Sequence, residues 1–547
     1  MASKKSSNNL LVQGGILATA AILVRFIGLL YRVPLDNIVG SEGMGIYSSA
    51  YHVYNIALLI SSYSLPLAVS KLVASRTIKK QYKNSFRIFL TSLIIGAFVG
   101  LIASLIVYFG ADFFAMKITN SLTIAIPLRV LSPTIFIFAI MGVLRGFFQG
   151  NNSMVQTSVS QIIEQVVNAV VSILAASYCM KHFSLSKDGA AYGAAGATLG
   201  TLIGAIASLG FLIFVFILNR KYIKRKVDLD KSTYIDSYSL ISKMLAITVV
   251  PIILSQTVYQ LSSIIDTSMF NHIMDSQGHE ISYRNISLGI YNSKFILLTK
   301  VPISIATALA TAIVPSIVIS ITNGMMMEVK NKIGLGIKST MMIAFPSVAG
   351  MAVLASPILQ LLFKNSGPNE IEMATKMFQI GSVAIIFFAY STITNGILQA
   401  LDKMHIPIIH SSISLGIHIV FMYLLLSFGK LGIYALVIGN ISFPLIVCLL
   451  NWQYINKLLD YQQEIKKTFL ISCISALIMG VIAFVTYKGV YALVPSNTIS
   501  TIVAIALAAF SYFVLLIMLK GITEDELFQL PKGKVLIKIA RKLFLIR

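Results

Sequence analysis

Seven basic residues lie within or at the edges of long apolar segments of this 547-residue chain: Arg25, Arg32, Lys71, Arg129, Arg145, Lys294 and Lys300. Two acids, Glu164 and Asp266, are evident in the same segments. A charge at the centre of a bilayer costs about 2.5–3.5 kcal/mol, so bases that outnumber acids indicate a hydrated cavity that receives an anion. The pattern predicts a membrane transporter for an anionic substrate.

Arg25 and Arg32 are the first candidates for substrate binding. They are seven residues apart with Gly28 between them, so a helix places both on one face. A guanidinium can grip phosphate oxygens through two parallel hydrogen bonds. For each arginine, the alternative to substrate binding is that the side chain only extends along the helix to the membrane surface. Lys71 follows Pro66 and could bind substrate or anchor the helix end.

Lys294, Arg145 and Glu164 are the next candidates. We expect Lys294 to face the space between two lobes, on a helix that Pro302 allows to bend. Glu164 belongs to a polar stripe with Gln161, Gln165 and Asn168. It could hold Arg145 or Arg129 in position, bind the sugar of a substrate, or join helices by polar contacts.

Two residues are candidates for coupling transport to Na+ or H+. Asp266 lies in one apolar segment, and His410 lies in another together with His418. The alternative for Asp266 is a position at the outer interface of the membrane, and the alternative for the histidines is a role in helix packing. No ATP-binding motif and no His-Glu-x-x-His metal motif occurs in the sequence. We therefore predict no enzyme activity, no metal site and no cofactor beyond a coupling cation. Asp228 and Asp230 are expected to be solvated.

The elements that position these residues are membrane helices. The chain is 56% hydrophobic and 12% charged, with a mean hydropathy of +0.84. Because a bilayer core about 30 Å thick needs roughly 20 apolar residues per helix, the sequence predicts an all-α polytopic protein of about fourteen spans. They cover approximately 10–32, 44–70, 88–109, 121–145, 153–180, 190–219, 240–267, 287–318, 338–362, 374–401, 406–428, 431–452, 467–487 and 497–519.

The distribution of basic residues predicts the orientation. With the N-terminus inside, 28 of the 43 basic residues fall in cytoplasmic loops and tails, and eight fall in outer loops. The positive-inside rule then places both termini in the cytoplasm. The distribution of the net charge of +23 thus matches the membrane topology and does not indicate nucleic-acid binding. The tail 524–547 is expected to form an amphipathic helix on anionic inner-leaflet lipids.

An internal repeat predicts two six-helix lobes. At an offset of 250 residues, Ser132, Gly146 and Gln149 match Ser382, Gly396 and Gln399; an offset of 239 aligns the next helices. Parallel repeats of this kind are typical of transporters. The expected domains are an N-lobe (1–219), a cytoplasmic linker (220–243), a C-lobe (244–457), two further helices (458–523) and the tail (524–547). In this alignment Arg145 matches Asn395 and Glu164 matches Ser414, so charge is concentrated in the first lobe.

Three segments carry a resemblance to a known family. They are Leu23-Val-Arg25-Phe-Ile-Gly28-Leu-Leu-Tyr-Arg32-Val-Pro34 with Gly43-Met-Gly45-Ile-Tyr47, then Ser64-Leu-Pro66-Leu-Ala-Val-Ser70-Lys71, and Gly289-Ile-Tyr291 through Val314-Pro315-Ser316. Together they resemble the SpoVB/YtgP branch of the MurJ-like flippases. This branch belongs to the multidrug/oligosaccharidyl-lipid/polysaccharide exporter (MOP) superfamily.

The resemblance implies the MOP flippase fold and outward flipping of an undecaprenyl-pyrophosphate-linked saccharide. The family's cavity arginines map onto Arg25 and Arg32, and its helix-eight arginine maps onto Lys294. Val33 stands where many members have an acid, and Lys294 replaces that arginine, so the cargo stays open between lipid II and another polyprenyl-linked unit. A MATE-like drug or cation antiporter and a non-transporting scaffold in cell-wall or spore assembly are alternatives. Cell-wall synthesis proteins are possible partners.

Overall fold

The computed structural model describes residues 2–232, 234–529 and 533–542. Within these ranges every regular secondary-structure element is a helix, and no strand occurs. It divides into two compact units, Met1–Gly289 and Ile290–Arg547, and each unit is described by itself.

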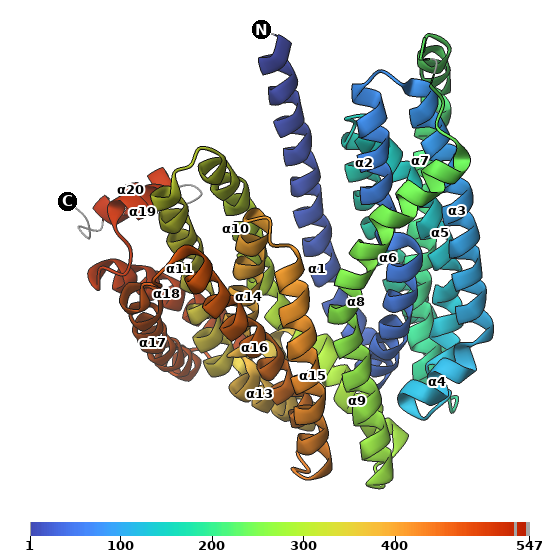
Figure 1. The fold of residues 1–547 in the computed structure, drawn as a ribbon. Coiled ribbons are helices and arrows are strands. Elements are labelled where there is room, and N and C mark those ends of the chain that lie inside the picture. The colour runs from blue at the N-terminus through green and yellow to red at the C-terminus, as the bar shows by residue number, and fades with distance from the viewer. Residues whose placement is uncertain (1, 233, 530–532, 543–547) are drawn as a thin grey trace. The chain divides into compact units, whose positions relative to one another are not determined.

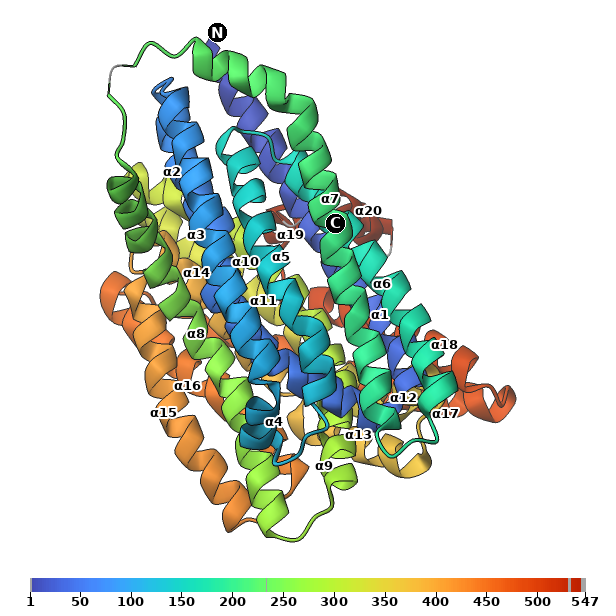
Figure 2. The same cartoon turned by 90° about the vertical axis from the view of Figure 1, so that its right-hand side faces the viewer.

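The first unit contains nine α-helices and one π-helical turn over its described residues (Figures 1 and 2). They are α1 (Ala2–Leu58), η1 (Leu59–Tyr63), α2 (Leu65–Ile78), α3 (Tyr82–Phe109), α4 (Ala111–Thr119), α5 (Ala125–Gly150), α6 (Val155–Phe183), α7 (Gly189–Asp228), α8 (Tyr238–Ser276) and α9 (Ile281–Gly289). Helix α5 packs against α2, α3 and α7, while α6 packs along α7 and α1. The interior of this bundle is therefore built around α5 and α6.

The second unit contains the remaining elements (Figure 1). They are η2 (Ile290–Ile296), α10 (Leu297–Thr322), α11 (Met326–Val353), α12 (Ala355–Leu362), α13 (Pro368–Gly381), α14 (Ala384–Ala400), α15 (His405–Ser427), α16 (Ile433–Leu459), η3 (Lys466–Ile471), α17 (Ser472–Leu493), α18 (Asn497–Met518), α19 (Glu524–Gln529) and α20 (Gly533–Lys542). Helix α14 packs against α10, α11 and α16, and α17 pairs with α18. Leu527 and Ala540 of the tail are buried in the α17–α18 cluster.

The helices confirm the predicted fold class. Eleven described helices are long and apolar enough to cross a membrane, and the bent pair α13–α14 makes twelve. One of the eleven runs from Thr19 to Ile78, and its backbone breaks at Gly40, where φ is +75°. Sixty residues of helix would extend about 90 Å, enough for the two spans predicted there. The observed helices are thus consistent with about fourteen spans.

A pair of glycines lets α1 and α9 approach closely. A Cβ on Gly45 would overlap the carbonyl of Asn285, and a Cβ on Gly289 would overlap the carbonyl of Ser41. Both glycines begin a Gly-Ile-Tyr sequence in the segments that carry the family resemblance. The contact gives a packing reason for these glycines, because any side chain would push the two helices apart.

The segment between α7 and α8 lies within the predicted 220–243 linker. Helix α7 continues to Asp228, and only residues 229–237 separate it from α8. Asp236 is buried and pairs with Arg76 at 2.8 Å, and Asn84 donates to the carbonyl of Tyr234 at 2.9 Å. The segment is therefore anchored to the α2–α3 turn, and the compact units divide at Gly289, beyond it.

Asp230 corrects the expectation of a solvated acid. It is 6% exposed and accepts hydrogen bonds from the amides of Lys83 and Ser232, each at 2.7 Å. Burial raises the pKa of Asp230, but these hydrogen bonds outweigh it and hold the pKa below its usual value.

Candidate functional site

A buried ion pair joins three helices in the interior of the first unit. Arg145 of α5 donates from Nη2 to Glu164 Oε2 of α6 at 2.7 Å. Its Nε donates to Ser160 Oγ of α6 and its Nη2 to Ser208 Oγ of α7, both at 3.0 Å. The two charged side chains are only 10% and 20% exposed. Of the two partners predicted for Glu164, the structure selects Arg145.

Small residues allow the helices to bring this pair together. Gly204 of α7 lies against the backbone of α6, where a Cβ would meet the Glu164 carbonyl at 2.6 Å. Ser208, one turn later, also donates to the Ser160 carbonyl at 3.0 Å. The close crossing of α6 and α7 therefore lets short hydroxyl side chains reach the guanidinium.

The polar stripe on α6 continues along the inside of the bundle. Asn168 Oδ1 accepts from Ser172 Oγ at 3.0 Å and from Thr201 Oγ1 of α7 at 3.4 Å. Thr201 is also hydrogen-bonded to Tyr51 of α1. On the facing side, Gly28 of α1 lies beside the Gln165 amide. The predicted stripe is thus a set of contacts between α6, α7 and α1.

Arg32 lies in a cluster of tyrosines on α1. It is half-buried, hydrogen-bonds with Tyr31 and lies close to Tyr47 and Tyr51. Tyr47 and Tyr51 have ring centroids 4.5 Å apart, and Tyr31 and Tyr47 approach through their hydroxyls at 3.5 Å. Arg25, two turns earlier, is exposed. Among the described residues, neither arginine forms an ion pair with a carboxylate.

Three further acids lie outside the apolar segments predicted from the sequence. Asp36, one turn after Arg32 on the same helical face, is 2% exposed. Asp112 of α4 pairs with Arg129 at 2.6 Å, and Glu370 of α13 lies 3.6 Å from Lys294. These acids lie in short helices or beside polar residues, so a search for long apolar segments does not include them. Arg129, Arg145 and Lys294 thus each have an acid beside them in the described part of the chain.

Lys294 lies in a buried environment within the second unit. Its side chain has no exposed surface, and its ammonium lies 5.1 Å from the centroid of the Phe363 ring as well as near Glu370. It belongs to the π-helical turn η2, a distortion that occurs often at functional sites. In the described conformation Lys294 contacts these side chains, so its expected role towards substrate stays a prediction.

The remaining candidates lie on separate helices. Lys71 is exposed on α2, Lys300 is exposed on α10, and Asp266 is half-buried on α8. Arg129 and Asp112 are 39% and 55% exposed, so that pair lies at a surface. Substrate binding by Lys71 and coupling by Asp266 remain predictions.

His410 belongs to a polar network in the second unit. Its Nδ1 lies 2.7 Å from Asn451 Oδ1, and Asn451 donates to Thr394 Oγ1 and Asn395 Oδ1 at 3.0 and 2.8 Å. At the 250-residue offset, Asn395 corresponds to Arg145 and His410 to Ser160. The two units therefore place polar networks at matching helix junctions, and only the first contains a charged pair. No group of three potential metal ligands occurs among the described residues.

Similarity to known proteins covers most of the chain. The family model described as "Polysaccharide biosynthesis protein" matches residues 10–320, which is more than half of the sequence. The chain belongs to the polysaccharide biosynthesis protein family. A MatE model matches residues 251–424 of this family member as well.

Relatives in Bacillus subtilis (strain 168) support the same assignment. Stage V sporulation protein B is 25% identical over 529 residues, covering 96% of this chain and 98% of the relative. Lipid II flippase MurJ is 27% identical over 424 residues, covering 76% of this chain and 77% of the relative. The predicted membership of the MurJ-like and SpoVB group of the MOP superfamily is confirmed.

Solved structures show the same fold. A lipid II flippase MurJ in an inward closed conformation superimposes with a TM-score of 0.68 at 15% identity, over 91% of this chain and 97% of that one. An inward-facing multidrug resistance MATE family transporter superimposes with a TM-score of 0.63 at 17% identity, over 81% of this chain and 98% of that one. The family member described here is a multi-pass membrane protein with the fold of MOP transporters.

Proposed function

We propose that this protein moves an undecaprenyl-pyrophosphate-linked saccharide from the inner to the outer leaflet of the bacterial plasma membrane, with lipid II as its cargo. The two lobes would alternate between inward and outward access. Both termini would lie in the cytoplasm, as the distribution of basic residues predicts.

The observation that supports this proposal is that Arg25 and Arg32 form no ion pair with a carboxylate of the described chain. Both lie in the apolar first helix. Arg32 instead hydrogen-bonds with Tyr31 and lies near Tyr47 and Tyr51, whose neutral hydroxyls supply no negative charge. An unneutralised guanidinium in a membrane is costly and is usually functional. A pyrophosphate would supply both the negative charge and the paired acceptor oxygens that a guanidinium binds best.

The other candidates would have supporting roles. Arg145 and Glu164 neutralise each other inside the helix bundle, so we assign them to holding α5, α6 and α7 in position. Lys294 would contribute charge towards the pyrophosphate after exchanging Glu370 for substrate. Relatives named lipid II flippase and stage V sporulation protein B support a lipid-linked cargo of cell-wall or spore assembly.

An antiporter for cationic compounds is the second candidate, because a MatE model matches residues 251–424. Such a transporter needs intramembrane carboxylates that can receive a cation. Glu164 and Glu370 are each already paired with a base. These two carboxylates are therefore not available to a cation in the described conformation, which supports an anionic cargo.

The test is complementation of a bacterium depleted of its lipid II flippase. We expect the wild-type protein to restore growth, and Arg25→Ala and Arg32→Ala to fail at matched membrane levels. Arg129→Ala is the matched control, since its guanidinium pairs with Asp112 at a surface, and it should restore growth. Rescue by Arg32→Ala would remove that residue from the site. Failure of correctly inserted wild-type protein would exclude lipid II and leave another polyprenyl-linked saccharide.

A further inference from the structure

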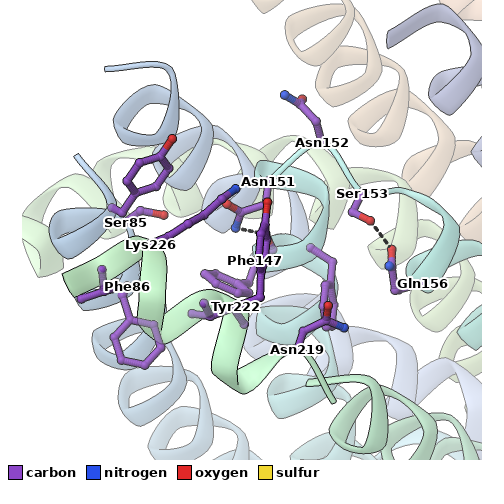
Figure 3. Close-up of a pocket in the computed structure, with 14 residues that line it drawn as sticks. Ser85, Phe86, Phe147, Asn151, Asn152, Ser153, Gln156, Asn219, Tyr222 and Lys226 are labelled. Carbon is purple, nitrogen blue, oxygen red and sulfur yellow. Dashed lines mark hydrogen bonds between the residues drawn. The ribbon is translucent and has the colours of Figure 1, made fainter. Parts of the chain in front are cut away.

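A polar cavity lies at the end of the first unit where α3 and α6 begin and α5 and α7 end (Figure 3). Its volume is about 250 Å³. Its walls combine aromatic rings, such as Phe86 and Phe147, with amide and hydroxyl side chains. This combination suits a small polar ligand that carries an apolar portion.

Lys226 of α7 gives the cavity a positive charge. It is the one charged residue in the lining that the structure describes. Its ammonium lies 4.5 Å from the ring centroid of Tyr222 and 5.4 Å from that of Tyr82. No carboxylate of the described chain forms an ion pair with it. Aromatic rings hold the ammonium in place without neutralising it, so it can still bind an anion.

Neutral donors complete the lining. Ser153 Oγ donates to Gln156 Oε1 at 2.5 Å, which fixes this amide and leaves its nitrogen without a described partner (Figure 3). Gln156 lies in the first turn of α6, which contains no acidic residue. The positive end of the α6 dipole therefore adds to the charge of Lys226.

The surface of α7 places the cavity at the level of a membrane interface. Phe214, Ile217 and Leu218 are large apolar residues with 60%, 61% and 66% exposure, and Arg220 and Lys221 follow directly. A change from exposed apolar to basic side chains marks the boundary between lipid tails and headgroups. Asn219 lines the cavity at this boundary. The positive-inside prediction assigns this end to the anionic cytoplasmic leaflet.

We propose that this cavity binds the phosphodiester headgroup of an anionic membrane lipid. The Lys226 ammonium binds the phosphate oxygens, and the Gln156 amide donates to the headgroup. The acyl chains extend along the apolar surface of α7. The site is separate from Arg25 and Arg32, and it does not depend on which cargo the protein transports.

The test is native mass spectrometry of the full-length protein in detergent, titrated with phosphatidylglycerol. We expect Lys226→Gln to weaken lipid binding about tenfold, because a charge-assisted contact is lost. Lys224→Gln is the matched control: it removes one charge from the exposed side of the same helix and should bind as the wild type does. Gln156→Leu should also weaken binding, and it provides a second variant that keeps the net charge.

Equal binding by Lys226→Gln and the wild type would overturn the site. An equal loss in Lys224→Gln would also overturn it, since binding would then follow net charge alone. A second arm tests the source of the phosphate by adding soluble glycerol phosphate. We expect no displacement of lipid at equal concentration; displacement would assign the cavity to a soluble phosphorylated compound and refute the lipid.

Discussion

The Arg145–Glu164 pair provides a direct test of how the first unit is held together. At 2.7 Å and an effective dielectric constant near 20, the two charges attract each other by about 6 kcal/mol. Desolvation offsets much of this gain, but Glu164→Ala would leave a buried guanidinium with only two serine hydroxyls. We therefore expect Glu164→Ala to lower the free energy of unfolding by about 3–5 kcal/mol. Glu164→Gln keeps an acceptor and should cost about 1–2 kcal/mol.

The assay is a double-mutant cycle of Glu164→Ala and Arg145→Met, with unfolding free energies measured in mixed detergent micelles. Since the double variant removes both charges, it should be far less destabilised than the sum of the single variants, with a coupling of about 2–3 kcal/mol. The matched control is the exposed Arg129–Asp112 pair, whose coupling should stay below about 1 kcal/mol. Additive effects at Arg145 and Glu164 would refute the reasoning.

Two further predictions concern the tail and the α1–α9 contact. Partial burial raises the pKa of Glu526, but hydrogen bonds from Lys338 and the Thr523 amide outweigh it and hold the pKa below the usual 4.5. The pair should thus stabilise α19 above pH 4.5 and lose this effect as the pH falls further. The measurement is the protection factor for amide exchange over 524–529, corrected for the intrinsic exchange rate at each pH: it should fall on acidification in the wild type and change less in Glu526→Gln. At the helix contact, Gly45→Val should destabilise the protein by about 1–3 kcal/mol, because its side chain would overlap the Asn285 carbonyl. Unchanged thermal unfolding of Gly45→Val would contradict that packing.

The sequence was sufficient to predict the helical fold because hydropathy reports burial in lipid directly. It also located the polar stripe on α6, since helical spacing places Glu164 and Asn168 on related faces. The break at Gly40 falls in the gap between two predicted spans, where glycine can adopt a positive φ. These features depend on which residues are neighbours within a short stretch of the sequence.

The pairing of charges could not be predicted in the same way. Lys294 meets Glu370, 76 residues away, and Lys338 meets Glu526 of the tail, across 188 residues. Arg284, which lies between two predicted spans, is 1% exposed and pairs with Asp275 at 2.8 Å. Such contacts depend on how helices pack, and a count of charges within apolar segments contains no information on packing.

The internal repeat helps to separate residues that hold the lobe together from residues that bind substrate. At matching junctions, Arg145 contacts Ser160 in the first unit, and Asn395 contacts Asn451, which in turn contacts His410, in the second. Polar contacts persist at both junctions although the charges differ, which is expected if their shared role is to join helices. The charge in the first unit is then compensated internally by Glu164. Under the proposed function, recognition of the anionic cargo would depend on bases that form no ion pair with a carboxylate of the described chain, and this favours Arg25 and Arg32 over Arg145.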